Sequence, residues 1–375
     1  MKKAKLGDIC TIVSGSTPKT SKKEYWDGNL RWITPAEIAD DSYFIYDTER
    51  YITEAGAMNA HLNLLPIGTV LLSSRAPIGK VAIAGAEMYC NQGFKNLICS
   101  PCVNNCYLYY YLKSKKDYLN SLGRGATFKE ISRQIVSEIE IPLPELDEQQ
   151  RIVRQFDLLA KLCNTKHQQI DLLELAVKSR FVELFGNPVI NQKRFPVKQV
   201  GDVIDFIGGS QPPKNVFEYT PTEENIRLIQ IRDYRTDKYK TYIPRKLAKR
   251  FCTADDIMIG RYGPPIFQIL GGIEGSYNVA LMKAVPKMGN REFIRWFLKQ
   301  ECLLHYLEGM SKRTAGQDGI QMDKLKKYPF PYPPIELQNQ FANFAKQLDK
   351  SRLAVQKSLD ELEILKKSLM QQYFG

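Results

Sequence analysis

The side chains that could carry catalysis are few in this sequence, and their spacing does not form a catalytic pattern. The three histidines are His61, His167 and His305. None of them stands next to a carboxylate in a spacing typical of general acid–base catalysis. The nearest approach to a Mg²⁺-binding carboxylate cluster is ADDSYFIYD from Ala39, which is more typical of a solvated loop than of a nuclease centre. We therefore expect no catalytic residue in this chain.

Signatures of nucleotide and methyl-transfer chemistry are also missing. The sequence has no G-x-x-x-x-G-K-[ST] loop and no G-x-G-x-x-G motif opening a βαβ unit. The tetrapeptide YPPI at Tyr332 resembles the motif of base methyltransferases but lacks the acidic or amide residue that the motif needs. The sequence therefore predicts no cofactor bound by this chain.

The eight cysteines favour free thiols over a metal centre. Their only close group is Cys99, Cys102 and Cys106, with Cys90 upstream. A zinc site usually takes two close pairs of ligands, and the second pair is missing here. We expect thiols of a reducing compartment, no metal site, and no assigned role for this group.

The formal net charge of +12 points to a polyanionic partner. Lys and Arg recur in Gly- and Pro-containing loops, where backbone amides and cations suit phosphates, and Arg, Asn and Gln suit base edges. The candidate contacts to nucleic acid in the first half are Ser16, Thr17, Lys19, Lys22, Lys23, Arg75, Lys80, Arg124 and Thr127. In the second half they are Ser210, Gln211, Lys214, Arg261, Tyr262, Lys312 and Arg313.

Two of these candidates, Arg75 and Arg261, are expected to be equivalent, because GTVLLSSRAP resembles DDIMIGRYGP. Reversal of either charge should then weaken nucleic-acid binding without unfolding the protein. The alternative is a shared structural role in capping a turn.

These candidates belong to a sequence that repeats itself. IPLPELDEQQ from Ile141 and PYPPIELQNQ from Pro331 are variants of one phrase, in which Pro142 corresponds to Pro331. At the same offset of 189 residues, Phe185-Gly186 matches Phe374-Gly375. LGDICTIVSGSTPK from Leu6 likewise matches VGDVIDFIGGSQPPK from Val200. The chain is therefore predicted to be a tandem duplication of one unit of about 185 residues.

Each repeated phrase precedes a predicted long helix. Apolar residues recur in alternating steps of four and three, a period typical of paired, supercoiling helices. In the first copy these positions hold Ile152, Phe156, Leu159, Cys163, Lys166, Ile170, Leu173 and Val177. In the second they hold Phe341, Ala345, Leu348, Arg352, Val355, Leu359, Leu362, Lys366, Leu369 and Tyr373. Polar residues fall at different points of the two copies, which favours one antiparallel pairing of the two helices over two unrelated surface helices.

The globular parts mix short β-like runs with one aromatic helical segment each. The runs TVLLSS, KVAIAG, KNLICS, IRLIQI and DIMIG predict strands, and YLYYYL and FIRWFL predict helices. We expect α+β domains with a twisted, mostly antiparallel sheet. The two aromatic segments are expected to face the core rather than to stack on bases.

Taken together, these residues make the chain similar, over its whole length, to the DNA-specificity (S) subunit of a type I restriction-modification system. The resemblance rests on LGDICTIVSGSTPK, RGATFKEISRQIVSEIEIPLPELDEQQRIV and FVELFG, and on the second copy of each. The second copy departs from the pattern at Leu337 and Phe341, and both residues still permit a helix to start there.

The resemblance implies an α+β pseudo-two-fold tandem repeat, with two similar target-recognition domains separated by two long antiparallel coiled-coil helices. The implied segments are residues 1–144 and 195–333 for the domains, and 145–186 and 334–375 for the spacer helices. Each domain is implied to read one half of an asymmetric, bipartite site in double-stranded DNA.

The resemblance also implies partners. Two modification (methyltransferase) subunits and the restriction/translocase subunits would carry S-adenosylmethionine, ATP and Mg²⁺, and this chain would be non-catalytic. Two alternatives remain: a two-domain reader of another restriction or phage-defence system, and a self-sufficient nucleic-acid enzyme. No signal peptide or transmembrane run is recognisable, so we expect a cytoplasmic protein without membrane contact.

Overall fold

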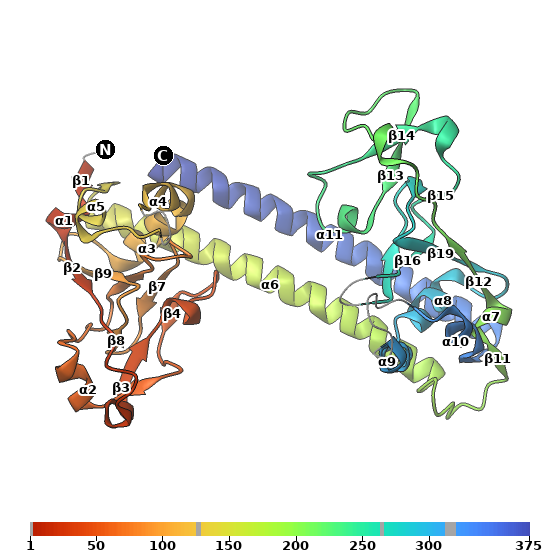
Figure 1. Cartoon of the computed structure of the whole chain (residues 1–375), viewed down its shortest axis with the longest axis horizontal. Coiled ribbons are helices and arrows are strands. Elements are labelled where there is room, and N and C mark those ends of the chain that lie inside the picture. Colours follow the sequence, from red (N-terminus) through yellow and green to blue (C-terminus); the bar gives the residue numbers. More distant parts are fainter. Residues whose placement is uncertain (1–2, 125–128, 263–265, 312–319) are drawn as a thin grey trace. The chain divides into compact units, whose positions relative to one another are not determined.

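The structure, a computed structural model, describes residues 3–124, 129–262, 266–311 and 320–375. The chain divides into two compact units. The first comprises Met1–Gln168 with Gln356–Gly375, and the second comprises Gln169–Val355. The long helices α6 (Leu146–Phe185) and α11 (Ile335–Phe374) each contribute to both units (Figure 1).

The first unit is built on a five-stranded sheet of order β2-β9-β6-β7-β4, antiparallel except for β4 and β7. A second sheet has the order β5-β3-β8, and β1 pairs with β10. The strands are β1 Lys3–Lys5, β2 Cys10–Ser14, β3 Trp26–Ile33, β4 Phe44–Ile45, β5 Tyr51–Ile52, β6 Val70–Leu72, β7 Val81–Ala84, β8 Tyr89–Cys90, β9 Lys95–Cys99 and β10 Glu140–Pro142. The helices are α1 Leu6–Ile9, α2 Glu54–Asn59, α3 Asn105–Ser114, α4 Lys116–Leu122 and α5 Arg133–Ser137, with 3₁₀ turns η1 Lys23–Tyr25 and η2 Pro35–Glu37.

The second unit repeats this plan with sheets of order β12-β19-β16-β17 and β14-β13-β18-β15, and β11 pairs with β20. Its strands are β11 Val197–Gln199, β12 Ile204–Gly208, β13 Asn225–Ile229, β14 Tyr242–Pro244, β15 Phe251–Cys252, β16 Ile257–Gly260, β17 Gln268–Gly271, β18 Gly275–Tyr277, β19 Leu281–Pro286 and β20 Pro329–Pro331. Its helices are α7 Val200–Val203, α8 Arg291–Leu298, α9 Glu301–Ser311 and α10 Met322–Lys327, with 3₁₀ turns η3 Lys214–Val216, η4 Ile231–Tyr234 and η5 Arg245–Leu247.

The predicted duplication is confirmed by equivalent elements with equivalent neighbours. The pair β2 and β9 corresponds to β12 and β19, and each pair is antiparallel. The parallel pair β3 and β8 corresponds to β13 and β18. Most strand pairs are antiparallel, as the sequence predicts. Both copies contain this parallel pair, and the first unit also pairs β4 with β7 in parallel.

The aromatic helices face the core, also as predicted. In α3, Tyr107, Tyr110 and Tyr111 are at most 4% exposed, and the Tyr110 ring stacks on Phe156 of α6 at 4.9 Å between centroids. In α8, Phe293 is 1% exposed and stacks on Phe181 at 5.8 Å. These rings are therefore not available for stacking on bases.

The two long helices pair antiparallel in each unit. In unit 1 the start of α6 lies against the end of α11, where Phe156 stacks on Phe374 at 5.8 Å and Tyr373 Oη donates to Gln155 Oε1 at 2.8 Å. In unit 2 the end of α6 lies against the start of α11, where Phe181 and Phe341 meet edge to face at 5.4 Å. Every position of the predicted apolar seam is buried or half-buried, so the 3.5-residue pattern is confirmed.

None of the helices in the described part of the chain is both long enough and apolar enough to cross a bilayer.

Candidate nucleic-acid interface

The two ends of the five-stranded sheet of unit 1 differ in chemistry. At one end, β6 begins and β9 ends beside the starts of α3 and α6. At the other end, β6 ends and β9 begins, and the chain enters loops rich in Ser, Thr, Asn, Gln and Arg. Because β6 and β9 are antiparallel, the loop after β6 and the loop before β9 meet at this second end.

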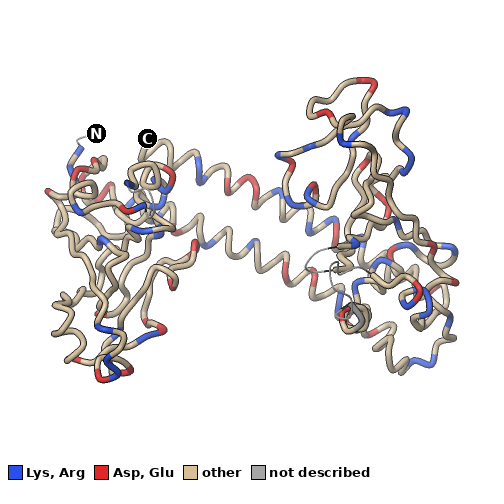
Figure 2. Tube along the Cα trace, viewed as in Figure 1, with Lys and Arg blue, Asp and Glu red and all other residues tan. Residues whose placement is uncertain are grey.

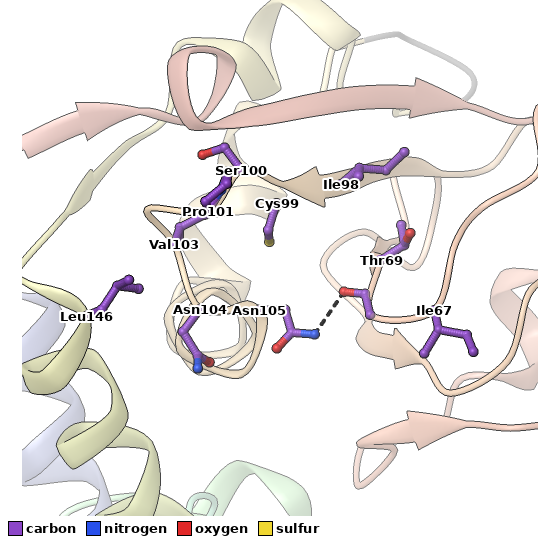
Figure 3. A pocket seen from close by; sticks show the side chains of 11 residues that line it. Ile67, Thr69, Ile98, Cys99, Ser100, Pro101, Val103, Asn104, Asn105 and Leu146 are labelled. Atoms are coloured by element: carbon purple, nitrogen blue, oxygen red, sulfur yellow. Dashed lines mark hydrogen bonds between the residues drawn. The ribbon is translucent and has the colours of Figure 1, made fainter.

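The first end holds a recess of about 420 Å³ (Figure 3). Ile67, Cys99 and Leu146 line it, and Asn105 Nδ2 donates to the Gly68 carbonyl at 3.0 Å. The Cys99 sulfur points into it (Figure 3). Among the residues that the structure describes, no three His, Cys, Asp or Glu side chains are placed to hold one metal ion. The described residues that line the recess therefore do not form a metal centre.

The second end gathers several of the predicted residues. Ser16 N donates to the Cys90 carbonyl at 3.1 Å, and Thr17 Oγ1 donates to Gln92 Oε1. Ser74 N donates to the Gly93 carbonyl at 2.7 Å, which places Arg75 beside the same loop. We call the segments 15–18, 73–77 and 91–94 the first loop cluster.

The second unit builds the same arrangement. Ser210 N donates to the Tyr277 carbonyl at 3.1 Å, and Arg261 N donates to the Ala280 carbonyl at 2.9 Å. We call the segments 209–212, 261–262 and 278–280 the second loop cluster. It brings together Ser210, Gln211, Arg261 and Tyr262.

Glycine is required at one equivalent point of each cluster. A Cβ atom on Gly15 would lie 2.2 Å from the Cys90 carbonyl oxygen, and one on Gly209 would lie 1.9 Å from that of Asn278. Both distances are far below van der Waals contact. The Gly-Ser start of both loops, visible in the sequence, therefore reflects close backbone packing and not ligand binding alone.

The expected equivalence of Arg75 and Arg261 is wrong by one residue. Val70 pairs with Leu97 in the first unit and Ile257 pairs with Ala284 in the second. When residues are counted from these pairs, Arg261 occupies the position equivalent to Ser74. The backbone hydrogen bonds agree, because Ser74 N donates to the Gly93 carbonyl and Arg261 N donates to the Ala280 carbonyl. Tyr262 therefore corresponds to Arg75. A match of two arginines in sequence does not fix strand register, and a shift of one residue turns a side chain to the other face of a strand.

The remaining candidates lie elsewhere or are already engaged. Lys80 Nζ donates to the Pro35 carbonyl at 3.1 Å, so its ammonium group is used within the unit. Lys22 pairs with Glu24 at 3.5 Å. Lys19, Lys22 and Lys23 stand on the segment that leads through η1 into β3, and exposed Lys214 begins η3. Thr127, Lys312 and Arg313 lie outside the described residues.

An ion cluster that sequence analysis missed adjoins the first loop cluster. Glu130 Oε2 lies 2.9 Å from Arg75 Nε, and Glu130 Oε1 lies 3.0 Å from Lys95 Nζ. Arg124 joins this region because its backbone exchanges two hydrogen bonds of 3.0 Å with Glu130. Burial alone would raise the pKa of the Glu130 carboxyl, but the hydrogen bonds from Lys95 and Arg75 outweigh burial and hold that pKa below its usual value.

Sequence analysis also missed a pair of asparagines that shape both clusters. Asn91 Oδ1 accepts from Gly93 N at 2.9 Å, and Asn278 Oδ1 accepts from Ala280 N at 3.1 Å. The two asparagines are equivalent in the strand register. An alignment anchored on the preceding strands would have found them, because each follows its strand directly.

Charge alone does not single out one surface. Lys and Arg occur on the loops of both units and along both long helices (Figure 2). The candidate interface is therefore defined by the equivalent loop clusters, where amide, hydroxyl and guanidinium groups meet.

The chain contains two copies of one α+β domain. Each copy has a polar loop cluster in the same place and continues into a long helix, and this arrangement defines a duplicated recognition protein. A model of the type I restriction modification DNA specificity domain matches residues 1–175 and 192–363. The chain therefore belongs to the type I restriction-modification DNA specificity family and carries its domain twice.

Individual relatives agree with this membership. The type I restriction enzyme MjaIX specificity subunit of Methanocaldococcus jannaschii is 38% identical over 246 residues, which is 61% of this chain and 56% of that protein. The match thus spans about half of that relative. The putative MjaX specificity subunit of the same organism is 32% identical over 407 aligned positions, covering 97% of this chain and 90% of that protein. The crystal structure of a type I S subunit from M. genitalium shares the fold, with a TM-score of 0.59 at 16% identity over all of this chain and 96% of that one.

Proposed function

We propose that this chain reads an asymmetric, bipartite site in double-stranded DNA, with one half-site for each domain. The observation that carries the proposal is the difference between the two loop clusters. The same backbone positions hold Ser74 and Arg75 in one domain and Arg261 and Tyr262 in the other. Because bases are distinguished by the donors and acceptors that face them, different side chains on one scaffold would select different half-sites.

In this proposal the chain recognises and scaffolds, and partners perform the chemistry. Two modification subunits would bring S-adenosylmethionine, and restriction/translocase subunits would bring ATP and Mg²⁺. The lack of nucleotide-binding and methyltransferase motifs in the sequence supports this division of labour. Contacts to phosphates would supply much of the affinity, which would then fall steeply with salt.

Exposed apolar side chains on the long helices support a scaffolding role. In unit 1, Leu158 and Ile364 are 59% and 67% exposed. In unit 2, Leu172 and Leu175 are 62% and 56% exposed, and Leu172 lines an apolar groove of about 400 Å³ with Leu173, Val355, Gln169 and Ser351. A contiguous exposed apolar surface, such as the one that Leu172 and Leu175 form beside this groove, is typical of surfaces that bind another protein.

Methylation mapping tests the proposal. The chain, purified with its modification partner, should direct methylation to a single bipartite sequence. Replacing residues 1–140 with the corresponding domain of another specificity subunit should change one half-site and leave the other unchanged. If both half-sites stayed unchanged, the proposal that each domain recognises its own half-site would be refuted. The native mass of the complex would separate two modification subunits from a single partner of another kind of system.

A further inference from the structure

The ion cluster of Arg75, Glu130 and Lys95 fixes one arginine at the edge of the first loop cluster. The two oxygens of Glu130 are held by different cations, Arg75 Nε at 2.9 Å and Lys95 Nζ at 3.0 Å. The Lys95 side chain is only 9% exposed, whereas that of Arg75 is 45% exposed. Lys95 therefore anchors the carboxylate from inside, and the carboxylate anchors the arginine.

The backbone around Arg75 is held as well. Ser74 N donates to the Gly93 carbonyl at 2.7 Å, and Ile131 N donates to the Ser74 carbonyl at 2.9 Å. Arg75 and Glu130 also face each other across an antiparallel β-bridge. Both the main chain and the plane of the guanidinium group are therefore set before any ligand binds.

The Nη1 and Nη2 groups of Arg75 are the donors that remain available for a ligand. Glu130 takes the Nε donor, and no described residue accepts a hydrogen bond from Nη1 or Nη2. Two parallel N–H donors on an exposed, oriented side chain match the O6 and N7 acceptors that guanine presents in the major groove.

The neighbouring carboxylate argues for a base and against a phosphate. Glu130 lies next to Arg75 and lowers the positive potential there, although Lys95 on its other oxygen offsets part of this effect, so a phosphate is attracted less than by an unpaired arginine. It also fixes the plane of the fork, which matters for two acceptors on a flat base edge more than for the oxygens of a tetrahedral phosphate. The adjacent Thr17–Gln92 pair adds hydroxyl and amide groups, which are likewise suited to base edges.

We propose that Arg75 recognises a guanine in the half-site of the first domain and that Glu130, anchored by Lys95, is its positioning residue. This inference rests on the proposed function of the chain as a DNA reader. The second domain has no such arrangement among its described residues. Tyr262 stands at the position of Arg75, and Met282 stands at that of Lys95. Arg261 Nη1 donates to the Val279 carbonyl at 3.4 Å, and no carboxylate of the described residues forms an ion pair with Arg261.

Selection from a randomised DNA library by the full-length chain tests this inference, with wild type, Arg75→Lys, Arg75→Ala and Glu130→Gln compared at one salt concentration. The wild type should demand guanine at one position of one half-site. Arg75→Ala should lose about 10- to 100-fold of discrimination at that position and none elsewhere. Arg75→Lys, which keeps the charge without the fork, should lose discrimination while retaining non-specific affinity. Glu130→Gln should relax the same position.

A matched control is Glu138→Gln, which removes the carboxylate of an exposed ion pair with Lys5 in the same unit. It should leave the selected sequence unchanged. Uniform weakening by Arg75→Ala on all sequences, with the salt slope reduced by about one, would assign Arg75 to a phosphate and overturn the inference. An unchanged guanine preference in Arg75→Lys and Arg75→Ala would also overturn it. A wild-type chain without any sequence preference would instead refute the proposed function itself.

Discussion

At the scale of single residues, a glutamine explains why the repeated phrase before each long helix is kept. Gln149 Oε1 accepts from Asn104 N, and Gln338 Oε1 accepts from Asn290 N, each at 2.8 Å. Asn104 and Asn290 cap α3 and α8. Each glutamine also donates to the carbonyl of the proline that precedes its helix, and both are fully buried. The glutamine thus ties each long helix to the aromatic helix of its domain.

Replacing this glutamine should destabilise the protein locally. In Gln149→Leu or Gln338→Leu, a partly buried backbone N–H loses its acceptor, and we expect a loss of about 1–3 kcal/mol in the free energy of unfolding. Thermal unfolding measures the effect. The controls Gln150→Leu and Gln340→Leu change exposed neighbours and should be nearly neutral. Equal losses in variants and controls would contradict the proposed tie.

Thiol reactivity offers a second test at the residue scale. Burial raises the pKa of Cys90 to about 12 and that of Cys252 to about 11, so both remain protonated at pH 8. Cys102 is exposed. Alkylation of the folded protein at pH 8, followed by peptide mass analysis, should modify Cys102 first and spare the other two. In urea all three should react. Rapid labelling of Cys90 or Cys252 without denaturant would show that they are not protected.

At the scale of elements, the ends of the long helices close the cores of both units. Phe374, near the end of α11, contacts Tyr107, Tyr111 and Phe156 in unit 1. Phe185, at the end of α6, contacts Phe293 and Phe341 in unit 2. The repeated Phe-Gly ending therefore has a packing role: each long helix begins in one unit and completes the aromatic core of the other unit.

Truncation of these rings should loosen one unit at a time. Phe374→Ala and Phe185→Ala each remove a side chain that is 4% exposed, which typically costs about 3–5 kcal/mol. Hydrogen exchange should report lost protection in α3 for the first variant and in α8 for the second. Leu365→Ala, at a position 47% exposed on α11, is the control. Loss of protection in both units from one variant would contradict independent cores.

At the scale of the whole molecule, we propose that DNA reading and partner binding occupy different elements. The loop clusters belong to the globular domains, whereas the exposed leucines belong to the long helices. If the helices recruit modification subunits, the two activities can be separated by substitution.

The double variant Leu172→Asp/Leu175→Asp should therefore lose co-purification with the modification subunit while keeping its melting temperature and its DNA binding. Both positions are more than half exposed, so charge there should not disturb the core of unit 2. Ser179→Asp, at an exposed polar position of the same helix, is the matched control. Normal complex formation by the double variant, measured by native mass, would remove this face from the proposed docking surface.

The sequence by itself determined the duplication, the two long helices, their apolar seam and most of the strands. These features depend on the spacing of apolar residues within one segment, and that spacing is legible without tertiary contacts. It also indicated Ser16, Thr17, Arg75, Ser210, Gln211, Arg261 and Tyr262, because Gly- and Pro-containing loops mark the ends of strands.

Only the tertiary structure decided how those residues are combined. The partner of Arg75 is Glu130 and that of Glu130 is Lys95, and these residues come from separate segments that meet only when the sheet forms. The same is true of the one-residue difference that makes Arg261 equivalent to Ser74, since strand register is fixed by pairing across the sheet and not by the identity of loop residues. The division of each long helix between two compact units likewise arises from packing against segments far away in the sequence.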